Sequence, residues 1–100
     1  MEGWDRKAGD TPPLQVELFS LPGCRQCQKT ARILEELAAG EETPPFRWRQ
    51  LDVVEALDHA VELGVLATPA IVIGGCLVHT GAPSRGQLQR LITAAGAGNG

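Results

Sequence analysis

The sequence predicts an α/β domain: a four-stranded mixed sheet with helices on both faces, in the order β-α-β-α-β-β-α. Two apolar runs of strand length, residues 16–21 and 70–73, form the centre of this prediction. Helical spacing over residues 24–39 separates the first strand from the next, as in a right-handed parallel crossover. Gly74-Gly75 is a two-residue turn of the hairpin type, which makes the last two strands antiparallel.

Composition indicates an ordinary globular chain with room for one domain. One hundred residues, 43% of them hydrophobic and 21% charged, suffice for a modest core. The net charge of −3 gives no reason to expect nucleic acid or an anionic membrane as a partner. No apolar run approaches the roughly 18 residues of a membrane span, and the first residues lack a secretory apolar core. We therefore expect a cytoplasmic protein with a flexible lead over 1–13, a domain over 14–95 and a loose tail over 96–100.

The first half of the domain follows from its apolar pattern. Residues 16–21 are apolar at nearly every position, as in a strand covered on both faces, and Pro22-Gly23 ends it. Helical periodicity then extends from Cys24 to a stop at Gly40. Residues 46–53 alternate at first, and their two arginines, Arg47 and Arg49, predict an edge strand with one solvated face.

The second half repeats the alternation of helix and strand. Residues 54–63 read as a short helix that ends at Gly64, with a weakly apolar face formed by Val54, Leu57 and Val61. Residues 70–73 give the strongest strand signal in the chain, and residues 76–79 return as its hairpin partner.

The last helix has a recognisable start. Ser84 is followed three residues later by Gln87, which matches a capping box. The apolar residues of this helix are Leu88, Leu91 and Ile92.

The motif Cys24-Arg25-Gln26-Cys27 lies where the first strand gives way to the first helix. A thiolate is the reactive form of cysteine, and the free N–H groups and dipole of a helix N-terminus stabilise it. The chain has three cysteines, an odd number that argues against a purely structural disulfide framework. In a reducing compartment two cysteines at this spacing are catalytic or bind metal.

Together with Thr68-Pro69 before the third strand and Gly81 before the last helix, this motif resembles the thioredoxin superfamily in its small glutaredoxin-like form. The resemblance covers about residues 14–95. It implies a cis bond before Pro69, which then lies against the two cysteines. The residues expected to contact substrate are Arg25, Gln26, Ala67, Thr68, Pro69 and Gly81.

The sequence also departs from the family pattern. The tryptophan that precedes the first cysteine in thioredoxins is absent, and Arg-Gln stands between the cysteines. The turn before the last helix lacks the acidic residue with which glutaredoxins hold glutathione. These departures leave the redox potential and the native reductant open.

In this interpretation Cys24 is the nucleophile and Cys27 the resolving cysteine. Cys24 lies at the helix N-terminus, where a thiolate is stabilised and exposed, and Arg25 adds positive charge. Cys27, one turn further, attacks the mixed disulfide and releases the product. Asp52 and Asp58 are candidate proton acceptors, and the sequence places neither of them near the sulfurs.

Two other classes of function stay open. Cys24, Cys27, Cys76 and His79 form a complete ligand set for zinc, although the predicted topology separates Cys76 from the first pair by ~13 Å. The alternatives are thus a metal-binding protein that uses the two close cysteines for zinc or an iron–sulfur centre, and a redox-inactive docking module. We interpret Cys76 as a small apolar strand residue, with an exposed thiol at the hairpin as the other interpretation.

The sequence therefore predicts a thiol–disulfide oxidoreductase that reduces protein or small-molecule disulfides without a bound cofactor or metal. Its electrons would come from a reductase or a low-molecular-weight thiol. We expect it to act as a monomer.

Overall fold

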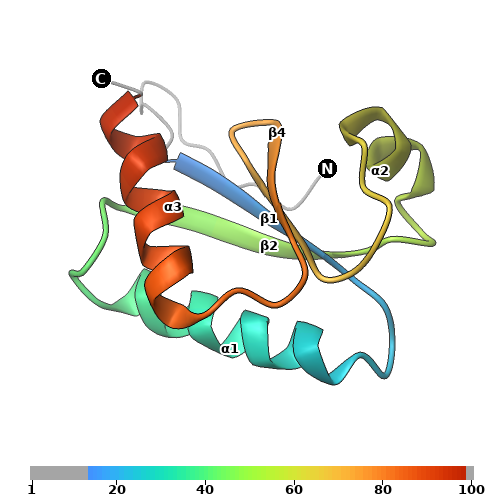
Figure 1. Cartoon of the computed structure of the whole chain (residues 1–100), viewed down its shortest axis with the longest axis horizontal. Helices are drawn as coiled ribbons and strands as arrows, with labels where there is room; N and C mark the ends of the chain where they lie inside the picture. The colour runs from blue at the N-terminus through green and yellow to red at the C-terminus, as the bar shows by residue number, and fades with distance from the viewer. Residues whose placement is uncertain (1–13, 99–100) are drawn as a thin grey trace, which may run out of the picture.

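The computed structural model describes residues 14–98, with side chains over 14–96, and the predicted lead over 1–13 lies outside the described residues. The predicted fold class and order of elements are confirmed (Figure 1). The elements are β1 (Leu14–Ser20), α1 (Arg25–Ala39), β2 (Phe46–Asp52), α2 (Leu57–Leu63), β3 (Ala70–Ile73), β4 (Cys76–Thr80) and α3 (Arg85–Gly98).

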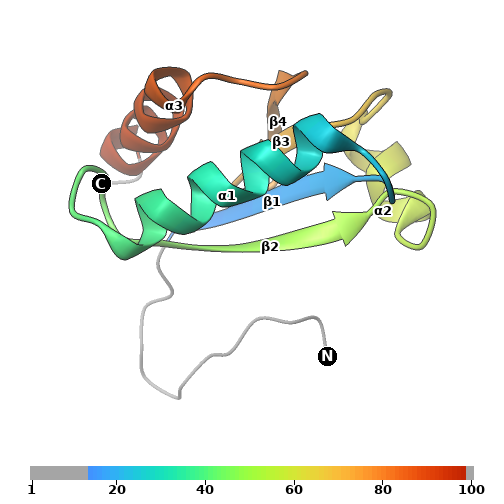
Figure 2. The ribbon, with the colours of Figure 1, turned by 90° about the horizontal axis from the view of Figure 1, so that it is seen from below.

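The four strands form one mixed sheet in the order β2-β1-β3-β4. Strands β1 and β2 are parallel, with Ser20 beside Asp52, and Figure 2 shows them advancing side by side beneath α1. Strand β3 is antiparallel to both β1 and β4. Strand β2 is an edge strand, as its two arginines predicted.

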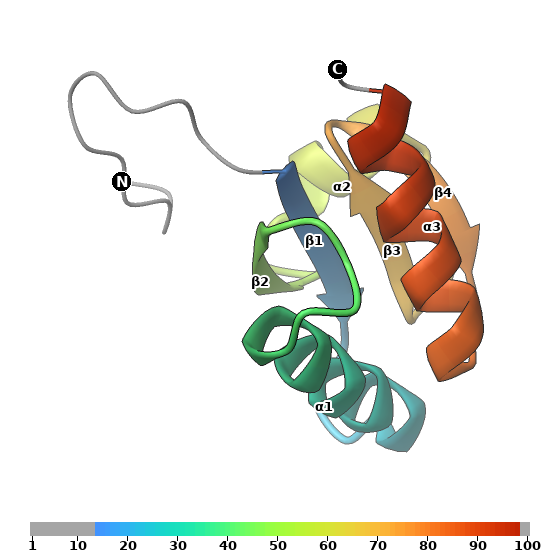
Figure 3. The same cartoon turned by 90° about the vertical axis from the view of Figure 1, so that its left-hand side faces the viewer.

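Two apolar cores lie on opposite faces of the sheet. The larger core joins alternate residues of β1 and β3 to leucines and an isoleucine of α1 and α3, and Figure 3 shows these two helices beside each other. The smaller core lies under α2 and contains Phe19, Ala60, Val65, Ala70 and Val72. The unbroken apolar run of β3, and the apolar residues that β1 contributes to both cores, are therefore explained by burial on both faces of the sheet.

The predicted apolar face of the second helix is wrong. Val54, Leu57 and Val61 are 67%, 55% and 67% exposed, and the helix buries Ala60 instead. The helix also begins later than predicted, because the Asp52 carboxylate accepts hydrogen bonds from the N–H groups after it and holds the chain in a turn. The short helix therefore packs against the sheet through the small side chain of Ala60, and its larger apolar side chains are exposed to solvent.

The capping box of α3 is confirmed. The N–H of Gln87 donates to Ser84 Oγ, and the N–H of Ser84 donates to Gln87 Oε1, both at 3.1 Å. The helix continues to Gly98, past the predicted start of a loose tail at residue 96. Gly96 lies so close to Pro44 that an added Cβ would stand 2.8 Å from the proline Cγ. This packing carries the helix further than its glycine-rich sequence suggested.

Arg49, predicted to lie on a solvated face of β2, instead forms an ion pair with Glu17 of β1. Arg49 donates from Nε and Nη2 to Glu17 Oε2 at 3.1 and 2.6 Å, and His59 Nε2 lies 3.1 Å from Glu17 Oε1. Glu17 is only 7% exposed, and a buried carboxylate needs such partners. Arg49 therefore holds β2 to β1 and is not a solvated side chain.

Candidate active site

The loop after β1 places Cys24 at the start of α1. Leu21 to Cys24 form a turn in which the Cys24 N–H donates to the Leu21 carbonyl at 3.2 Å. Pro22 and Gly23 take its central positions, and Gly23 has a φ of 80°, as a type II turn requires. Cys24 then has extended backbone and serves as the N-cap of the helix. Strand, turn and helix thus form a single local unit.

The sulfur of Cys24 meets the free donors of the helix N-terminus. The Cys27 N–H donates to Cys24 Sγ at 3.1 Å. This N–H is one of the four at the start of a helix that have no intrahelical partner, and it carries part of the positive end of the dipole. The position favours the thiolate of Cys24 over the thiol.

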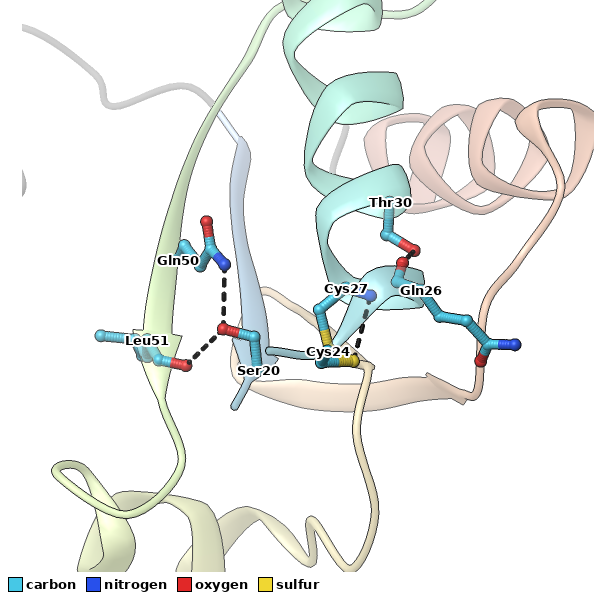
Figure 4. The surroundings of a disulfide bond; sticks show 7 residues. All are labelled: Ser20, Cys24, Gln26, Cys27, Thr30, Gln50 and Leu51. Atoms are coloured by element: carbon cyan, nitrogen blue, oxygen red, sulfur yellow. Dashed lines mark hydrogen bonds between the residues drawn. A yellow bond between two sulfur atoms is a disulfide. The ribbon is translucent and has the colours of Figure 1, made fainter. Parts of the chain in front are cut away.

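Cys24 and Cys27 form a disulfide, and their Cα atoms are 5.2 Å apart (Figure 4). Their exposures differ sharply: Cys24 is partly exposed, whereas Cys27 is 1% exposed. Thr30, about one turn further and also buried, donates its hydroxyl to the Gln26 carbonyl at 2.8 Å. Only Cys24 can therefore be reached from outside.

A groove of about 420 Å³ opens beside the disulfide, between the first turn of α1 and the carboxyl end of β2. Its lining residues are Ser20, Leu21, Pro22, Gly23, Cys24, Cys27, Gln28, Gln50, Asp52 and Glu55. A larger hollow of about 610 Å³ lies along α3, but no residue lining it can exchange disulfides.

The wall of the groove is ordered by Ser20, which is 5% exposed. Its hydroxyl accepts a hydrogen bond from Gln50 Nε2 at 2.9 Å and lies 3.5 Å from the Leu51 carbonyl (Figure 4). Parallel neighbours bring their carboxyl ends to one edge of a sheet, where ligands of open α/β sheets bind. The β1–β2 register does this with Ser20 and Asp52.

Sequence reasoning missed Gln28, Gln50 and Glu55 as residues of the site. Gln50 lies on β2 and Glu55 follows it. The predicted parallel crossover places the carboxyl end of this strand beside that of the first strand, so it could have indicated both residues. Of the two candidate proton acceptors, Asp52 lines the groove together with both cysteines, and Asp58, on α2, does not.

The predicted substrate residues do not line the groove. Arg25 and Gln26 are exposed in the first turn of α1, and Figure 4 shows the Gln26 side chain extending away from Ser20 and Gln50. Ala67, Thr68 and Pro69 precede β3, whose Ala70 pairs with Phe19, so they lie at the same end of the sheet as Cys24.

Pro69 connects two of these segments. The Thr68–Pro69 bond is cis, and the buried proline accepts a 2.7 Å hydrogen bond on its carbonyl oxygen from the Gly81 N–H. The turns before β3 and α3 are thus joined directly.

Cys76 lies apart from the disulfide. It pairs with Ile73, at the opposite end of β3 from Pro69, and its thiol is free and exposed. The interpretation of Cys76 as an apolar strand residue is therefore replaced by that of an exposed thiol beside the hairpin.

Within residues 14–98 there is no group of three or more His, Cys, Asp or Glu side chains placed to hold a metal ion. None of the described helices has the length and apolar content to cross a membrane.

Comparison with known sequences gives a consistent result. The sequence profile of the family described as "Thioredoxin domain" matches residues 14–93. The chain is 34% identical over 79 residues to a thioredoxin of Methanocaldococcus jannaschii, covering 79% of this chain and 92% of that protein. It is 32% identical over 75 residues to a probable thioredoxin of Methanothermobacter thermautotrophicus, covering 75% and 87% of the two chains.

Comparison with solved structures also finds thioredoxins. The oxidised mitochondrial thioredoxin 3 of Saccharomyces cerevisiae aligns with a TM-score of 0.69 and 29% identity, over 83% of this chain and 79% of that one. A thioredoxin variant from Halobacterium salinarum aligns with a TM-score of 0.72 over 85% and 76% of the two chains, and at 24% identity it supports the fold alone. With its two cysteines joined at the mouth of α1, this chain belongs to the thioredoxin family and is a thiol–disulfide oxidoreductase.

Proposed function

We propose that the protein reduces disulfides with Cys24 as the nucleophile and Cys27 as the resolving cysteine. The Cys24 thiolate attacks one sulfur of the substrate disulfide, forms a mixed disulfide and releases the other sulfur as a thiolate. The Cys27 thiolate then attacks Cys24 Sγ and releases the second substrate sulfur. Two electrons pass to the substrate, and the protein is left with its Cys24–Cys27 disulfide.

The observation that carries this proposal is the difference in exposure between the two sulfurs. Cys24 is reachable and accepts the Cys27 N–H, whereas Cys27 is 1% exposed. An incoming disulfide can therefore meet Cys24 only. Cys27 is covered by protein and can attack only the sulfur beside it, which is the task of a resolving cysteine.

The proposal extends to the segments around the disulfide. Arg25 and Gln26 border Cys24 in the sequence, and the backbone of exposed Ala67 and partly exposed Thr68 is proposed to hydrogen-bond an extended substrate. Pro69 and Gly81 hold that segment in place through their mutual hydrogen bond. The electron donor is a reductase or a low-molecular-weight thiol, and the protein acts as a monomer in the cytoplasm, where cellular reductants can restore the dithiol.

The test is a trap for the mixed disulfide. Cys27→Ser removes the resolving thiol, so the reduced variant is expected to accumulate a covalent adduct with a disulfide-bonded protein such as insulin. Mass spectrometry of the acid-quenched reaction should locate the adduct on Cys24. Cys76→Ser in the same background is the control and should leave the adduct yield unchanged. An adduct on Cys76, or none at all, contradicts the assignment.

A further inference from the structure

The groove beside the disulfide presents several hydrogen-bond acceptors without partners in the described part of the chain. Asp52 Oδ1 accepts from the N–H groups of Val54 and Glu55 at 2.8 and 3.3 Å, and its second oxygen has no partner among residues 14–96. The Glu55 carboxylate likewise has none in this part of the chain and is exposed. Two carboxylates with unused acceptor capacity thus border the reactive pair.

A third acceptor is fixed by its own hydrogen bond. Gln50 donates from Nε2 to the buried Ser20 hydroxyl, and Figure 4 shows its oxygen at the far end of the amide. Ser20 is 5% exposed and its hydroxyl also lies near the Leu51 carbonyl, so this hydrogen bond orients the amide of the otherwise exposed Gln50. Gln50 Oε1 has no partner among the described side chains.

No cationic residue lines the groove. Arg25 is next to Cys24 in sequence but belongs to the exposed first turn of α1 and is absent from the lining. The groove therefore carries two negative charges and an amide oxygen without a compensating cation, and Cys24 and Cys27 form part of the same wall. Because Cys24 lines both the groove and the path of an incoming disulfide, a residue beside the attacked substrate cysteine can enter the groove and meet these groups.

We propose that Gln50, Asp52 and Glu55 form a specificity subsite that selects protein disulfides flanked by lysine or arginine. This inference rests on the proposed reaction at Cys24 and names the substrate class for it. An ammonium or guanidinium group finds acceptors and opposite charge there, while a flanking carboxylate is repelled. Glutathione disulfide, which carries four carboxylates and two ammonium groups, is correspondingly disfavoured.

The test compares two peptide disulfides under single-turnover conditions. The substrates are the symmetrical disulfides of Ac-Ala-Lys-Cys-Lys-Ala-NH₂ and Ac-Ala-Glu-Cys-Glu-Ala-NH₂, each mixed with an excess of reduced protein. Oxidation of the Cys24–Cys27 pair is followed by acid quench and mass spectrometry, so no other reductant interferes. At low ionic strength the lysine peptide should react at least about tenfold faster than the glutamate peptide. The carboxylates of Asp52 and Glu55 attract the lysine side chains and repel the glutamate side chains. Added salt should shrink this ratio.

The variants Asp52→Asn and Glu55→Gln, combined, should reduce the lysine-to-glutamate ratio several-fold. Asparagine keeps the Oδ1 acceptor for the turn after β2, so the fold is expected to survive, and thermal unfolding checks this. Glu62→Gln is the matched control, because Glu62 is an exposed carboxylate of α2 outside the groove. It should leave the ratio unchanged.

The possible outcomes separate the two proposals. A ratio near one in the unmodified protein, or a high ratio that the double variant retains, overturns the subsite while leaving the exchange reaction intact. Failure of both peptides to oxidise the reduced protein overturns the assignment of Cys24 itself, and the subsite falls with it.

Discussion

Helices α1 and α3 begin in nearly the same way, and the comparison shows what turns a helix start into a reactive site. Residues 24–27 read Cys-Arg-Gln-Cys, and residues 84–87 read Ser-Arg-Gly-Gln. In both, the first side chain accepts the N–H of the residue three positions later, at 3.1 Å. The backbone thus offers the same donors to a sulfur in one helix and to a hydroxyl oxygen in the other.

The difference lies in the fourth residue of each motif. Gln87 is exposed and returns a hydrogen bond to the Ser84 N–H, which completes a purely stabilising cap. Cys27 is buried and forms a covalent bond to Cys24. An N-cap therefore becomes a redox centre when the side-chain atom that accepts the N–H is a sulfur that can form a disulfide with a buried cysteine.

The two arginines differ in the same sense. Arg85 pairs with Glu36 and Glu42 at 2.6 and 2.9 Å, and the hydrogen bonds to Glu42 and then Glu36 raise its pKa. Arg25 has no such partner within residues 14–96. Ion pairs therefore join the first turn of α3 to other parts of the chain, whereas the arginine in the first turn of α1 has no ion pair among the described residues.

The largest expected effect comes from Cys24→Ser, which gives α1 the N-cap residue that α3 already has. The variant should fold with an intact cap, because serine is a preferred N-cap residue. Turnover should fall by at least ~10³-fold, since a hydroxyl cannot replace the thiolate. An insulin-reduction assay and thermal unfolding of the reduced protein measure the two quantities. Residual turnover that disappears on adding Cys76→Ser would assign the reaction to the other thiol.

A second prediction compares the two thiols directly. In the fully reduced protein at pH 6, iodoacetamide should alkylate Cys24 at least about tenfold faster than Cys76, because helix N–H groups stabilise the thiolate only at Cys24. Peptide mapping after timed quenching measures both rates in one sample. Equal rates would mean that the helix N-terminus does not activate Cys24.

A smaller effect is expected from Ser84→Ala, which removes the cap of α3. Loss of the hydroxyl should lower the free energy of unfolding by about 1 kcal/mol and the midpoint temperature by several degrees. Disulfide turnover should stay as in the unmodified protein, because α3 contributes no residue to the groove. Ser84→Thr is the matched control and should retain most of the stability. A large loss of turnover in Ser84→Ala would show that the two helix starts are coupled.

The smallest effect is expected from Arg85→Ala. Its ion pairs to Glu36 and Glu42 are exposed, so solvent screens them strongly. The variant should lose less stability than Ser84→Ala, and high salt should remove the difference from the unmodified protein. A loss that persists in high salt would indicate that the arginine stem, rather than its charge, holds α3 in place.

Several features could be predicted because their causes are local. Gly74 and Gly75 both adopt positive φ, which specifies the hairpin turn wherever it occurs in a chain. Ser84 and Gln87 lie three residues apart, so their reciprocal hydrogen bonds depend on helix geometry alone. The same spacing brings Cys24 and Cys27 together, and the alternation of apolar runs with helical periodicity determined the order of the elements.

Other features depend on which distant surfaces meet. Val54, Leu57 and Val61 have helical spacing, but the space beneath α2 is filled by Phe19 and Val65, so the helix turns Ala60 inward. The pairing of Arg49 with Glu17 required the register of β1 and β2. No local pattern contains such a register.

The amino-acid sequence alone determined that two thiols meet in the first turn of a helix, because this arrangement is local and needs only the backbone. The tertiary structure decided which sulfur meets solvent and which groups surround it. Burial of Cys27 and the meeting of Ser20 with Gln50 and Asp52 result from packing α1 against two parallel strands, and that packing joins residues about 30 positions apart.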